Sequence, residues 1–355
     1  MFKINSNYQR QLLMNIRAAI KAVTSNVDLD KDQMITVMRE LMSGQSTDAQ
    51  NAAFLVGLQM KGVKSSEILG GITVMRELAT KVQLADHPHM VDTCGTGGSG
   101  SNKFNVSTAS AIVAACAGAK VAKHGNRGAT SKSGSADVLE AAGVNLTLSA
   151  EDVAATIEHL GIGFMFAPAH HSAMKHVITA RKEIGVRTVF NLMGPLTNPA
   201  GAPNQIIGVF DVAWIPSLLE VVKELGSSHV LIVAAEDGLD EISIAATSTV
   251  GELRDGEISL YTVEPSDFGI ERYADYSMLQ IDSAEASLAM LKDALGNRNQ
   301  AAADIVALNA GAAIYAANLT DDLAAGVVRA QSILQSGEAL AKLEKLVEFT
   351  QSLKK

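Results

Sequence analysis

Glycines and small polar residues gather between positions 91 and 108, which read VDTCGTGGSGSNKFNVST, with one lysine and no acid after Asp92. Glycines let backbone N–H groups approach a ligand closely, and a helix N-terminus adds unpaired donors and a positive dipole. We expect a helix to begin near Asn105, where Ser107 and Thr108 can cap it or lend hydroxyls to a phosphate or a hydrated metal. The pattern is neither GxGxxG nor GxxxxGK[ST], so it predicts an anion cradle of another kind.

A second glycine loop, VAKHGNRGATSKSGS at 121–135, combines basic residues with several hydroxyls. Lys123, His124 and Arg127 lie together, and a helix is expected to follow at Ala136. Taken alone, this loop could be a solvated surface turn. Two successive strand–loop–helix crossings place both loops at the carboxyl edge of a parallel sheet, where ligands bind in open α/β folds.

An acidic pair, Asp240 and Glu241, lies in AEDGLDEI at 235–242, after a predicted strand. In a regular strand adjacent side chains point to opposite faces, so the pair can share a site only in a loop or at a strand end. Carboxylates combined with substrate phosphates suit Mg²⁺. The alternative is an acidic pair on a solvated face.

The segment FMFAPAHHSAMKHVITARKEIGVR at 164–187 is rich in basic residues. Its histidines (His170, His171 and His176) have no neighbouring cysteine or carboxylate, which is poor evidence for zinc. Arg181 is of more interest, because a planar guanidinium matches a carboxylate in a bidentate manner. The alternative is a surface arginine on an amphipathic helix.

The charge distribution favours a small anionic ligand. The 355-residue chain has a net charge of −9, which disfavours nucleic acid or an anionic membrane as a general partner. The 44 residues from Thr93 to Ala136 contain no acid, whereas the chain average predicts about five. The basic residues of this window are Lys103, Lys120, Lys123, Arg127 and Lys132. An acidic protein with one acid-free basic segment is expected to have a pocket for a small anion.

The location expected from the sequence is the cytoplasm. Only Cys94 and Cys116 occur, without a CxxC pair, which fits a reducing compartment. The N-terminus lacks the apolar run of a signal peptide, and no stretch approaches the length of a membrane span.

Two kinds of periodicity indicate two domains. Residues 1–85 show helical spacing at 34–42, 54–60 and 68–78, with no strand pattern. From Met90 onward, short β-prone runs alternate with helices, which predicts βαβ units and a mostly parallel sheet. The expected strands are 90–91, 120–123, 163–166, 188–190, 205–210 and 229–234. The expected helices are 106–117, 136–142, 149–160, 172–184, 216–225, 284–295, 301–318 and 321–353, with a polar hairpin at 249–265.

The predicted fold class is α/β: a small N-terminal helical domain and a larger α/β domain with a central, mostly parallel sheet. The boundaries expected are 1–85 for the helical domain, joined by part of 168–200, and 86–355 for the catalytic domain.

Five motifs together resemble anthranilate phosphoribosyltransferase. They are GTGG at 95–98, NVST at 105–108, KHGNR at 123–127, SGSADVLEAAG at 133–143 and VFNLMGPLTNPA at 189–200, and DGLDE at 237–241 fits as well. The likeness runs from about residue 5 to the C-terminus. It implies a nucleoside phosphorylase/phosphoribosyltransferase-like fold, a dimer formed through the helical domain, and a role in tryptophan biosynthesis. The implied reaction joins anthranilate and phosphoribosyl pyrophosphate to give phosphoribosyl anthranilate and pyrophosphate.

The resemblance also implies the roles of individual residues. Those expected around the phosphoribosyl donor are Gly95, Gly98, Ser99, Lys103, Asn105, Val106, Ser107, Thr108, Lys123, His124, Gly125, Asn126, Arg127, Gly128, Ala129, Thr130, Ser131 and Ser135. Ser107, Asp240 and Glu241 would hold one or two Mg²⁺ ions. Gly95, Asn126 and Arg181 would contact anthranilate, with His124 nearby.

The implied chemistry needs stabilisation of the leaving group more than a base. Pyrophosphate leaves C1 of the ribose as the sugar becomes oxocarbenium-like, so Mg²⁺, backbone donors and Lys123 are expected to stabilise the charge that develops. The anthranilate amine is neutral at pH 7 and already nucleophilic, and positioning carries much of the remaining rate. We expect direct displacement with inversion at C1, which a covalent ribosyl-enzyme would refute.

Two positions depart from the family pattern. Ser99 stands where relatives usually have Asp, which removes a carboxylate beside the pyrophosphate, and Ser99→Asp is the variant that tests its effect. Ser172 stands where relatives usually have Pro, which is expected to loosen the start of the following helix.

Two rival functions are considered. A pyrimidine nucleoside phosphorylase shares the architecture but has a different basic-loop motif, and it would release free base in the presence of phosphate. A nucleic-acid binder related to this family would be basic and would lack the metal and anthranilate positions. The net charge, the acidic pair and Arg181 disfavour the second rival.

Overall fold

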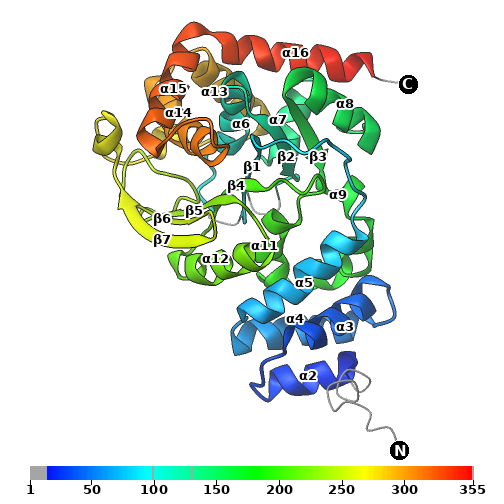
Figure 1. Cartoon of the computed structure of the whole chain (residues 1–355). Coiled ribbons are helices and arrows are strands. Elements are labelled where there is room, and N and C mark those ends of the chain that lie inside the picture. The colour runs from blue at the N-terminus through cyan, green and yellow to red at the C-terminus, as the bar shows by residue number, and fades with distance from the viewer. Residues whose placement is uncertain (1–13, 98–99, 129–130, 354–355) are drawn as a thin grey trace, which may run out of the picture. The chain divides into compact units, whose positions relative to one another are not determined.

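The computed structural model describes residues 14–97, 100–128 and 131–353 (Figure 1). Its contacts divide the chain into two compact units. One unit comprises the described residues up to Thr80 together with His171–Thr197, and the other comprises Lys81–His170 and Asn198 onward.

The first unit is helical throughout. Its elements are α2 (Ile16–Thr24), α3 (Lys31–Met42), α4 (Asp48–Lys61), α5 (Ser65–Leu78), the 3₁₀ helix η1 (Ser172–His176), α10 (Ile178–Ile184), α11 (Val189–Met193) and the 3₁₀ helix η2 (Gly194–Thr197). Capping boxes begin two of the helices, at Asp30 for α3 and at Thr47 for α4. A Cβ on Gly71 of α5 would lie 2.3 Å from the Met193 sulfur, so glycine is what lets α11 pack this closely.

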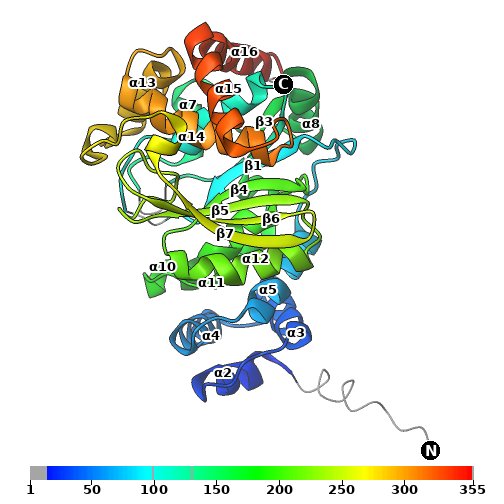
Figure 2. The same cartoon turned by 60° about the vertical axis from the view of Figure 1, so that its left-hand side comes forward.

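The second unit is built on one seven-stranded sheet with the order β3-β2-β1-β4-β5-β6-β7 (Figure 2). Its strands are β1 (Met90–Gly95), β2 (Lys120–Gly125), β3 (Ile162–Phe166), β4 (Asn204–Gly208), β5 (His229–Ala235), β6 (Ser248–Arg254) and β7 (Glu257–Val263). The first five strands are parallel and the last two are antiparallel. The predicted α/β fold class, with its mostly parallel sheet, is therefore confirmed.

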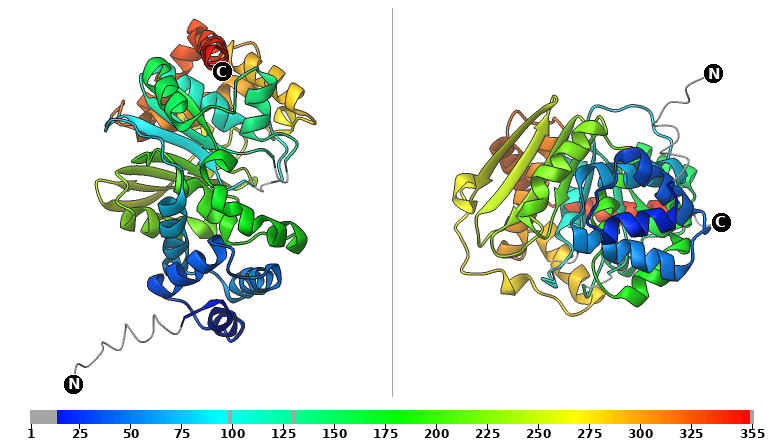
Figure 3. Two further views of the ribbon diagram at one scale, coloured as in Figure 1. Left: turned by 90° about the vertical axis from the view of Figure 1, so that its right-hand side faces the viewer. Right: turned by 90° about the horizontal axis from the view of Figure 1, so that it is seen from below.

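The predicted hairpin forms the edge of this sheet, where β6 and β7 lie side by side (Figure 3). Asp255 and Gly256 connect the two strands, with φ of 51° and 83°. A two-residue Asp-Gly loop with positive φ at both positions matches the right-handed twist of the strands that it joins.

Helices cover both faces of the sheet, and Figure 2 shows α12 and α14 on opposite sides of it. The helices are α6 (Val106–Cys116), α7 (Ser135–Ala141), α8 (Ala150–Leu160), α9 (Ala167–His170), α12 (Ile215–Glu224), α13 (Ala284–Leu295), α14 (Gln300–Ala316), α15 (Leu323–Ser336) and α16 (Glu338–Ser352). Short 3₁₀ helices lie at η3 (Val212–Trp214), η4 (Pro265–Phe268) and η5 (Ser277–Leu279).

The two faces of the sheet enclose separate cores. Val121 of β2 belongs to a large core with α6 and α14, which are apolar and buried nearly all round. Its neighbour Ala122 points to the other face and packs with Val153 and Ile157 of α8. With both faces covered, the strand ends and their loops remain as the natural place for a ligand.

Three expected elements differ in the structure. The strand expected at 188–190 is wrong, because Thr188 caps the short helix α11. The helix expected at 172–184 is divided into η1 and α10. The helix expected at 321–353 is two helices, since Gly337 adopts φ 79° between α15 and α16. In the described part of the chain, no helix has the length and apolar character needed to cross a membrane.

Candidate active site

The candidate site lies at the carboxyl end of β1, where the strand order reverses. From β1 the chain proceeds to β2 on one side of the sheet, while β4 lies on the other side. Gly95 at the end of β1 is in register with Gly208 at the end of β4. A crevice at such a switch point is where ligands bind in open α/β sheets.

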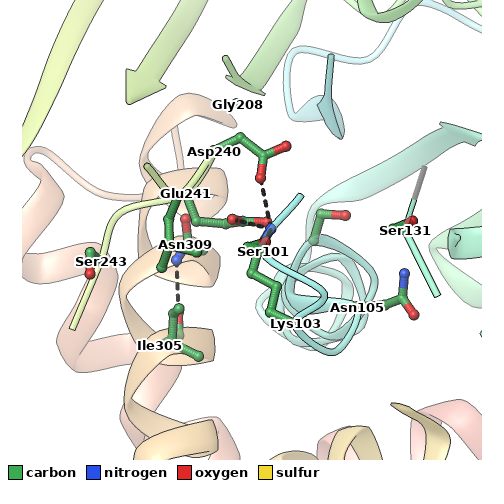
Figure 4. Close-up of polar contacts among 12 residues, drawn as sticks. Ser101, Lys103, Asn105, Ser131, Gly208, Asp240, Glu241, Ser243, Ile305 and Asn309 are labelled. Carbon is green, nitrogen blue, oxygen red and sulfur yellow. Dashed lines mark hydrogen bonds and ion pairs between the residues drawn. The ribbon is translucent and has the colours of Figure 1, made fainter. Parts of the chain in front are cut away.

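Asp240 and Glu241 belong to the irregular segment between β5 and β6, so both carboxylates can reach one point. The Lys103 Nζ lies 2.7 Å from Asp240 Oδ1 and 2.7 Å from Glu241 Oε2 (Figure 4). The three side chains are only 8–11% exposed. Two like charges in so dry a place need a cation, and Lys103 supplies it.

The pKa values of these groups reflect their mutual proximity. Burial opposes the charged form of Lys103, but Asp240 and Glu241 outweigh burial and raise its pKa. Burial likewise works against ionisation of Asp240, yet Lys103 keeps the pKa of that carboxyl below its usual range. Burial and the neighbouring Asp240 raise the pKa of Glu241 to about 8. The single positive charge of Lys103 therefore does not fully offset two buried carboxylates.

Two glycines let the acidic segment approach the sheet. A Cβ on Gly208 would lie 1.8 Å from the carbonyl oxygen of Asp240, and a Cβ on Gly95 would lie 2.9 Å from its Oδ2. Both distances are shorter than real Cβ contacts. Glycine at these positions thus determines where the Asp240 carboxylate is held.

Helix α14 fixes the acidic segment from the other side. Asn309 accepts a hydrogen bond from the Ile242 N–H through Oδ1 at 2.9 Å and donates to the Ile242 carbonyl through Nδ2 at 2.9 Å. Asn309 Nδ2 also donates to the carbonyl of Ile305 in its own helix, as Figure 4 shows. These hydrogen bonds fix the backbone next to the acidic pair to the buried helix α14.

Asn105 joins the two predicted anion loops. Its Nδ2 donates to the Ser133 carbonyl at 3.2 Å, and its Oδ1 accepts from the Ser133 hydroxyl at 2.9 Å. Ser287 of α13 donates to the same Oδ1 at 2.7 Å and accepts from the Asn105 N–H at 3.2 Å. The Asn105 side chain therefore holds both loops and α13 at one junction.

Removing the Ser287 hydroxyl is expected to weaken this junction. In Ser287→Ala, Asn105 loses one acceptor and one donor at a fully buried position, so the free energy of unfolding should fall by about 1–2 kcal/mol. Urea unfolding followed by circular dichroism measures the change. Ser266→Ala, at an exposed serine, is the matched control and should stay within about 0.5 kcal/mol of wild type. Equal stability of the two variants would show that the junction contributes nothing.

Lys123 lies beneath the first loop and is almost fully buried. Its Nζ donates to the Thr93 carbonyl at 2.5 Å and lies 3.4 Å from the Ser107 hydroxyl. Burial lowers the pKa of Lys123, against the attraction of Asp92. Asp92 itself is buried and accepts from the His124 N–H at 3.0 Å and from Asn198 Nδ2 at 2.7 Å. This network ties the end of β1 to the end of β2.

The basic loop is folded tightly upon itself. Asp137 Oδ2 accepts from the N–H groups of Gly128 and Gly134, each at 2.9 Å. A Cβ on Gly134 would lie 2.3 Å from the Gly128 nitrogen, so the two backbone segments nearly touch. Arg127 pairs with Asp137 at 3.0 Å and with Glu140 at 2.6 Å, and its guanidinium lies over the Phe166 ring.

The structure places the other predicted donor residues around the same strand ends. Val106, Ser107 and Thr108 form the first turn of α6, which contains no acid. The Thr108 hydroxyl is buried and has no hydrogen-bond partner among the described residues. The remaining described positions are Gly125 at the end of β2, Asn126 and Ser131 in the basic loop, and Ser135 at the start of α7. Gly98, Ser99, Ala129 and Thr130 lie outside the described residues.

Arg181 belongs to the helical unit, on the short helix α10. Its guanidinium lies over the Phe190 ring at 5.0 Å, and burial lowers its pKa. Within the described ranges of the chain, no carboxylate forms an ion pair with it. A half-buried arginine in this state is suited to receive the carboxylate of a ligand.

Sequence reasoning missed the residues that position the site. These are Asp92, Asp137, Asn198, Gly208, Ser287 and Asn309. Asp137 had a local signal, since it follows the glycine loop at the start of a helix. The partners of Ser287 and Asn309 lie 182 and 67 residues away in the chain, and no local pattern points to them.

The residues present fit a magnesium ion that is shared with a substrate. Mg²⁺ binds one or two carboxylates and completes its octahedron with waters and phosphate oxygens. Asp240 and Glu241 supply two adjacent carboxylates that already hold a cation, the ammonium of Lys103. Among the described residues, no group of three or more His, Cys, Asp or Glu side chains could hold a metal ion.

Comparison with known proteins defines the class to which the fold and the site belong. A family model described as the α/β domain of the glycosyl transferase family matches residues 87–340. The helical bundle domain of that family matches residues 17–79. The class is therefore that of the two-domain glycosyl transferases.

Individual relatives narrow the class. An anthranilate phosphoribosyltransferase of Thioalkalivibrio sulfidiphilus is 55% identical over 339 residues, which cover 96% of this chain and 100% of the relative. The chain belongs to the anthranilate phosphoribosyltransferase family.

Solved structures agree with this assignment. The Thermus thermophilus enzyme of the same name aligns with a TM-score of 0.87 and 40% identity over 94% of this chain and 99% of its own. The Saccharomyces cerevisiae enzyme in complex with phosphoribosyl pyrophosphate and Mg aligns with a TM-score of 0.82 and 26% identity over 95% of this chain and 98% of its own. The yeast enzyme with 4-fluoroanthranilate aligns with a TM-score of 0.81 and 25% identity, over the same shares of the two chains.

Proposed function

We propose that this chain transfers the phosphoribosyl group of phosphoribosyl pyrophosphate to the amine of anthranilate in tryptophan biosynthesis. The products are N-(5-phosphoribosyl)anthranilate and pyrophosphate. The observation that carries the proposal is the buried pair Asp240 and Glu241, which meets Lys103 at the switch point of the sheet. A pyrophosphate leaving group needs a concentrated positive field at its oxygens, and this pair can bind the cation that provides it.

The donor is proposed to lie across the two glycine loops. The acid-free first turn of α6 offers N–H groups and hydroxyls to phosphate oxygens, and the Thr108 hydroxyl is without a protein partner among the described residues. Asn105, through Ser133, keeps the basic loop beside that turn. The residues that the resemblance implies around the phosphoribosyl donor, from Gly95 to Ser135, follow the edge that these two loops form.

Asp240 and Glu241, with Ser107, are proposed to hold one or two Mg²⁺ ions together with the donor. When bound, the metal neutralises charge on the pyrophosphate oxygens as the bond to C1 breaks. The chain contributes the fixed position of the two carboxylates, which Gly208 and Asn309 determine. Lys123 is buried against Thr93 and Ser107, and from there its charge stabilises the loop that faces the leaving group.

The reaction proposed is a direct displacement with inversion at C1. The amine of anthranilate attacks as the bond to pyrophosphate breaks, and the product loses a proton to solvent. No base is assigned, because the amine is neutral and nucleophilic at pH 7. Gly95, Asn126 and Arg181, with His124 nearby, are proposed to orient anthranilate, so that positioning supplies much of the rate.

Replacement of Arg181 tests its role. In Arg181→Ala the acceptor carboxylate loses a charge-assisted, bidentate partner, so KM for anthranilate should rise on the order of tenfold, with KM for the donor nearly unchanged. Arg181→Lys should recover only part of the loss, because an ammonium lacks the planar fork. Steady-state kinetics with each substrate varied in turn gives both constants. A defect confined to the donor KM would overturn the assignment.

A nucleoside phosphorylase is the rival on the same fold, and parallel assays separate the two. With anthranilate, the donor and Mg²⁺, the chain should release one pyrophosphate for each phosphoribosyl anthranilate formed. With uridine or thymidine and inorganic phosphate it should release no free base. Phosphorolysis without phosphoribosyl transfer would replace the proposal by its rival.

We extend the proposal to the assembly and the location of the protein. The resemblance implies a homodimer that forms through the helical unit, and the chain is proposed to work in the cytoplasm with small-molecule substrates. No nucleic acid or membrane partner is proposed, in keeping with the net charge of −9.

A further inference from the structure

The ammonium of Lys103 contacts both carboxylates of the acidic pair that would hold a metal ion. We propose that Lys103 is a built-in cation that holds the magnesium position in the ligand-free chain, so that metal binding is an exchange of one cation for another. This inference rests on the proposed function, because it takes the acidic pair to be the metal site. It concerns what Lys103 does before and after the metal arrives.

The contacts of the Lys103 nitrogen are the first observation that supports the exchange. One nitrogen lies 2.7 Å from an oxygen of each carboxylate, and all three side chains are about nine-tenths buried. Figure 4 shows Lys103 pointing to the pair from a different loop, with Ser101 beside it. The same nitrogen also lies 3.3 Å from the Ser101 hydroxyl. The lysine charge is therefore directed at the acidic pair.

Coexistence of the two cations is disfavoured. Mg²⁺ binds carboxylate oxygens at about 2.0–2.1 Å and demands near-octahedral geometry. An ammonium 2.7 Å from the same two carboxylates would lie a few ångströms from the metal. Repulsion at that distance is strong where little water screens it, so Lys103 must leave for the metal to bind well.

The backbones on both sides of the ion pair are held in place. The backbone of Lys103 forms a β-bridge with Gln280, and the neighbouring Phe104 N–H donates to the Leu279 carbonyl at 3.0 Å. The acidic segment is held by Asn309 and closely packed against Gly208. A lysine has a flexible four-carbon stem, so it can swing while both backbones stay in place.

The exchange explains how the metal and the donor can assist each other. A displaced Lys103 carries its charge into the anion loop, where it can meet the pyrophosphate or the phosphate of the donor. An anion that attracts the Lys103 ammonium draws it away from Asp240 and Glu241. The metal then competes with less positive charge for the two carboxylates and binds more tightly. By thermodynamic linkage, the metal tightens donor binding by the same factor.

The first test is metal binding without substrates. Mn²⁺ serves as the probe, because electron paramagnetic resonance counts the free ion during a titration of the full chain. Lys103→Met keeps much of the side-chain volume and removes the charge, so it should bind Mn²⁺ at least about tenfold more tightly than wild type. Lys120→Met is the matched control. It removes a lysine charge at the first residue of β2, where Lys120 pairs with Glu158, away from the site at the carboxyl end of the strand. Its Mn²⁺ affinity should match that of wild type.

A second variant locates the effect. Lys103→Met combined with Asp240→Asn should lose the gain in Mn²⁺ affinity, because one of the two carboxylates is gone. Equal Mn²⁺ affinity of wild type and Lys103→Met, including no measurable binding by either, would overturn the proposal. So would a gain of the same size in Lys120→Met.

A measurement on the wild-type chain covers the case in which a variant fails to fold. Pulse acetylation with an N-hydroxysuccinimide ester, read by mass spectrometry, reports how exposed and how deprotonated each lysine is. Lys103 should be acetylated at least about threefold faster with saturating Mg²⁺ than without it, and Lys120 should be unaffected. An unchanged Lys103 rate with Mg²⁺ bound would overturn the exchange.

Mn²⁺ affinity and anthranilate consumption test the exchange and the proposed function separately. Tighter Mn²⁺ binding by Lys103→Met in a chain that does not consume anthranilate would support the exchange and refute the transfer reaction. Consumption of anthranilate by a wild-type chain whose Mn²⁺ affinity equals that of Lys103→Met would support the reaction and refute the exchange.

Discussion

Asp240→Asn combined with Glu241→Gln is expected to lower kcat for phosphoribosyl transfer by at least about a hundredfold. Both amides keep the shape of the side chains but cannot neutralise a metal, so the leaving pyrophosphate loses its main stabilisation. KM for anthranilate should change little, because the acceptor is proposed to bind through other residues. Initial rates at saturating Mg²⁺ and donor give kcat.

The control for this prediction must separate chemistry from folding. The two amides leave Lys103 buried without a counter-charge, which itself destabilises the chain. Adding Lys103→Met removes the stranded cation, and the triple variant should recover stability but not turnover. Glu236→Gln, at an exposed acid in the same segment, should turn over like wild type. Turnover by the double variant within about threefold of wild type would show that the pair holds no catalytic metal.

Gly208→Ala is expected to lower the free energy of unfolding by about 1–3 kcal/mol, together with a fall in kcat of about a hundredfold. The new methyl group would lie 1.8 Å from the Asp240 carbonyl oxygen, which is a backbone atom and cannot rotate away. The segment that carries Asp240 and Glu241 must therefore move. Urea unfolding and steady-state kinetics measure the two effects separately.

The control is Ser266→Ala, at an exposed serine outside the site. Its stability should stay within about 0.5 kcal/mol of wild type and its turnover should be unchanged. A Gly208→Ala variant with wild-type stability and turnover would mean that the close approach of the acidic segment to β4 does not determine the position of the carboxylates.

Much of the fold was predictable because it depends on local patterns. The alternation of β-prone runs with helical runs indicated the parallel sheet, and the Asp255-Gly256 pair indicated the hairpin at its edge. The pattern was wrong at 188–190, because Val189 and Phe190 are apolar and β-prone in either structure, and the helix start is marked only by the Thr188 N–H, which donates to Asn191 Oδ1. It was also wrong at Gly337, where apolar spacing continues on both sides of the break.

The individual segments of the site could be predicted from the sequence, but the contacts between them could not. The acid-free loop, the basic loop and the acidic pair could each be recognised from residue types. Lys103 and Asp240, which form an ion pair, are 137 residues apart in the sequence, and no pattern in either segment predicts the contact. Gly208 illustrates the same limit, because its role depends on the backbone of Asp240, which approaches it from the irregular segment between β5 and β6. Such contacts follow from the tertiary fold alone.

The chain is expected to consume anthranilate in a reaction that needs both the phosphoribosyl donor and Mg²⁺. The most direct measurement is the loss of anthranilate fluorescence over time in the presence of the purified, folded chain. Fluorescence should fall only when donor and Mg²⁺ are both present, and the fall should stop when a chelator removes the metal. No loss of fluorescence under those conditions, or an equal loss without the donor, would contradict it.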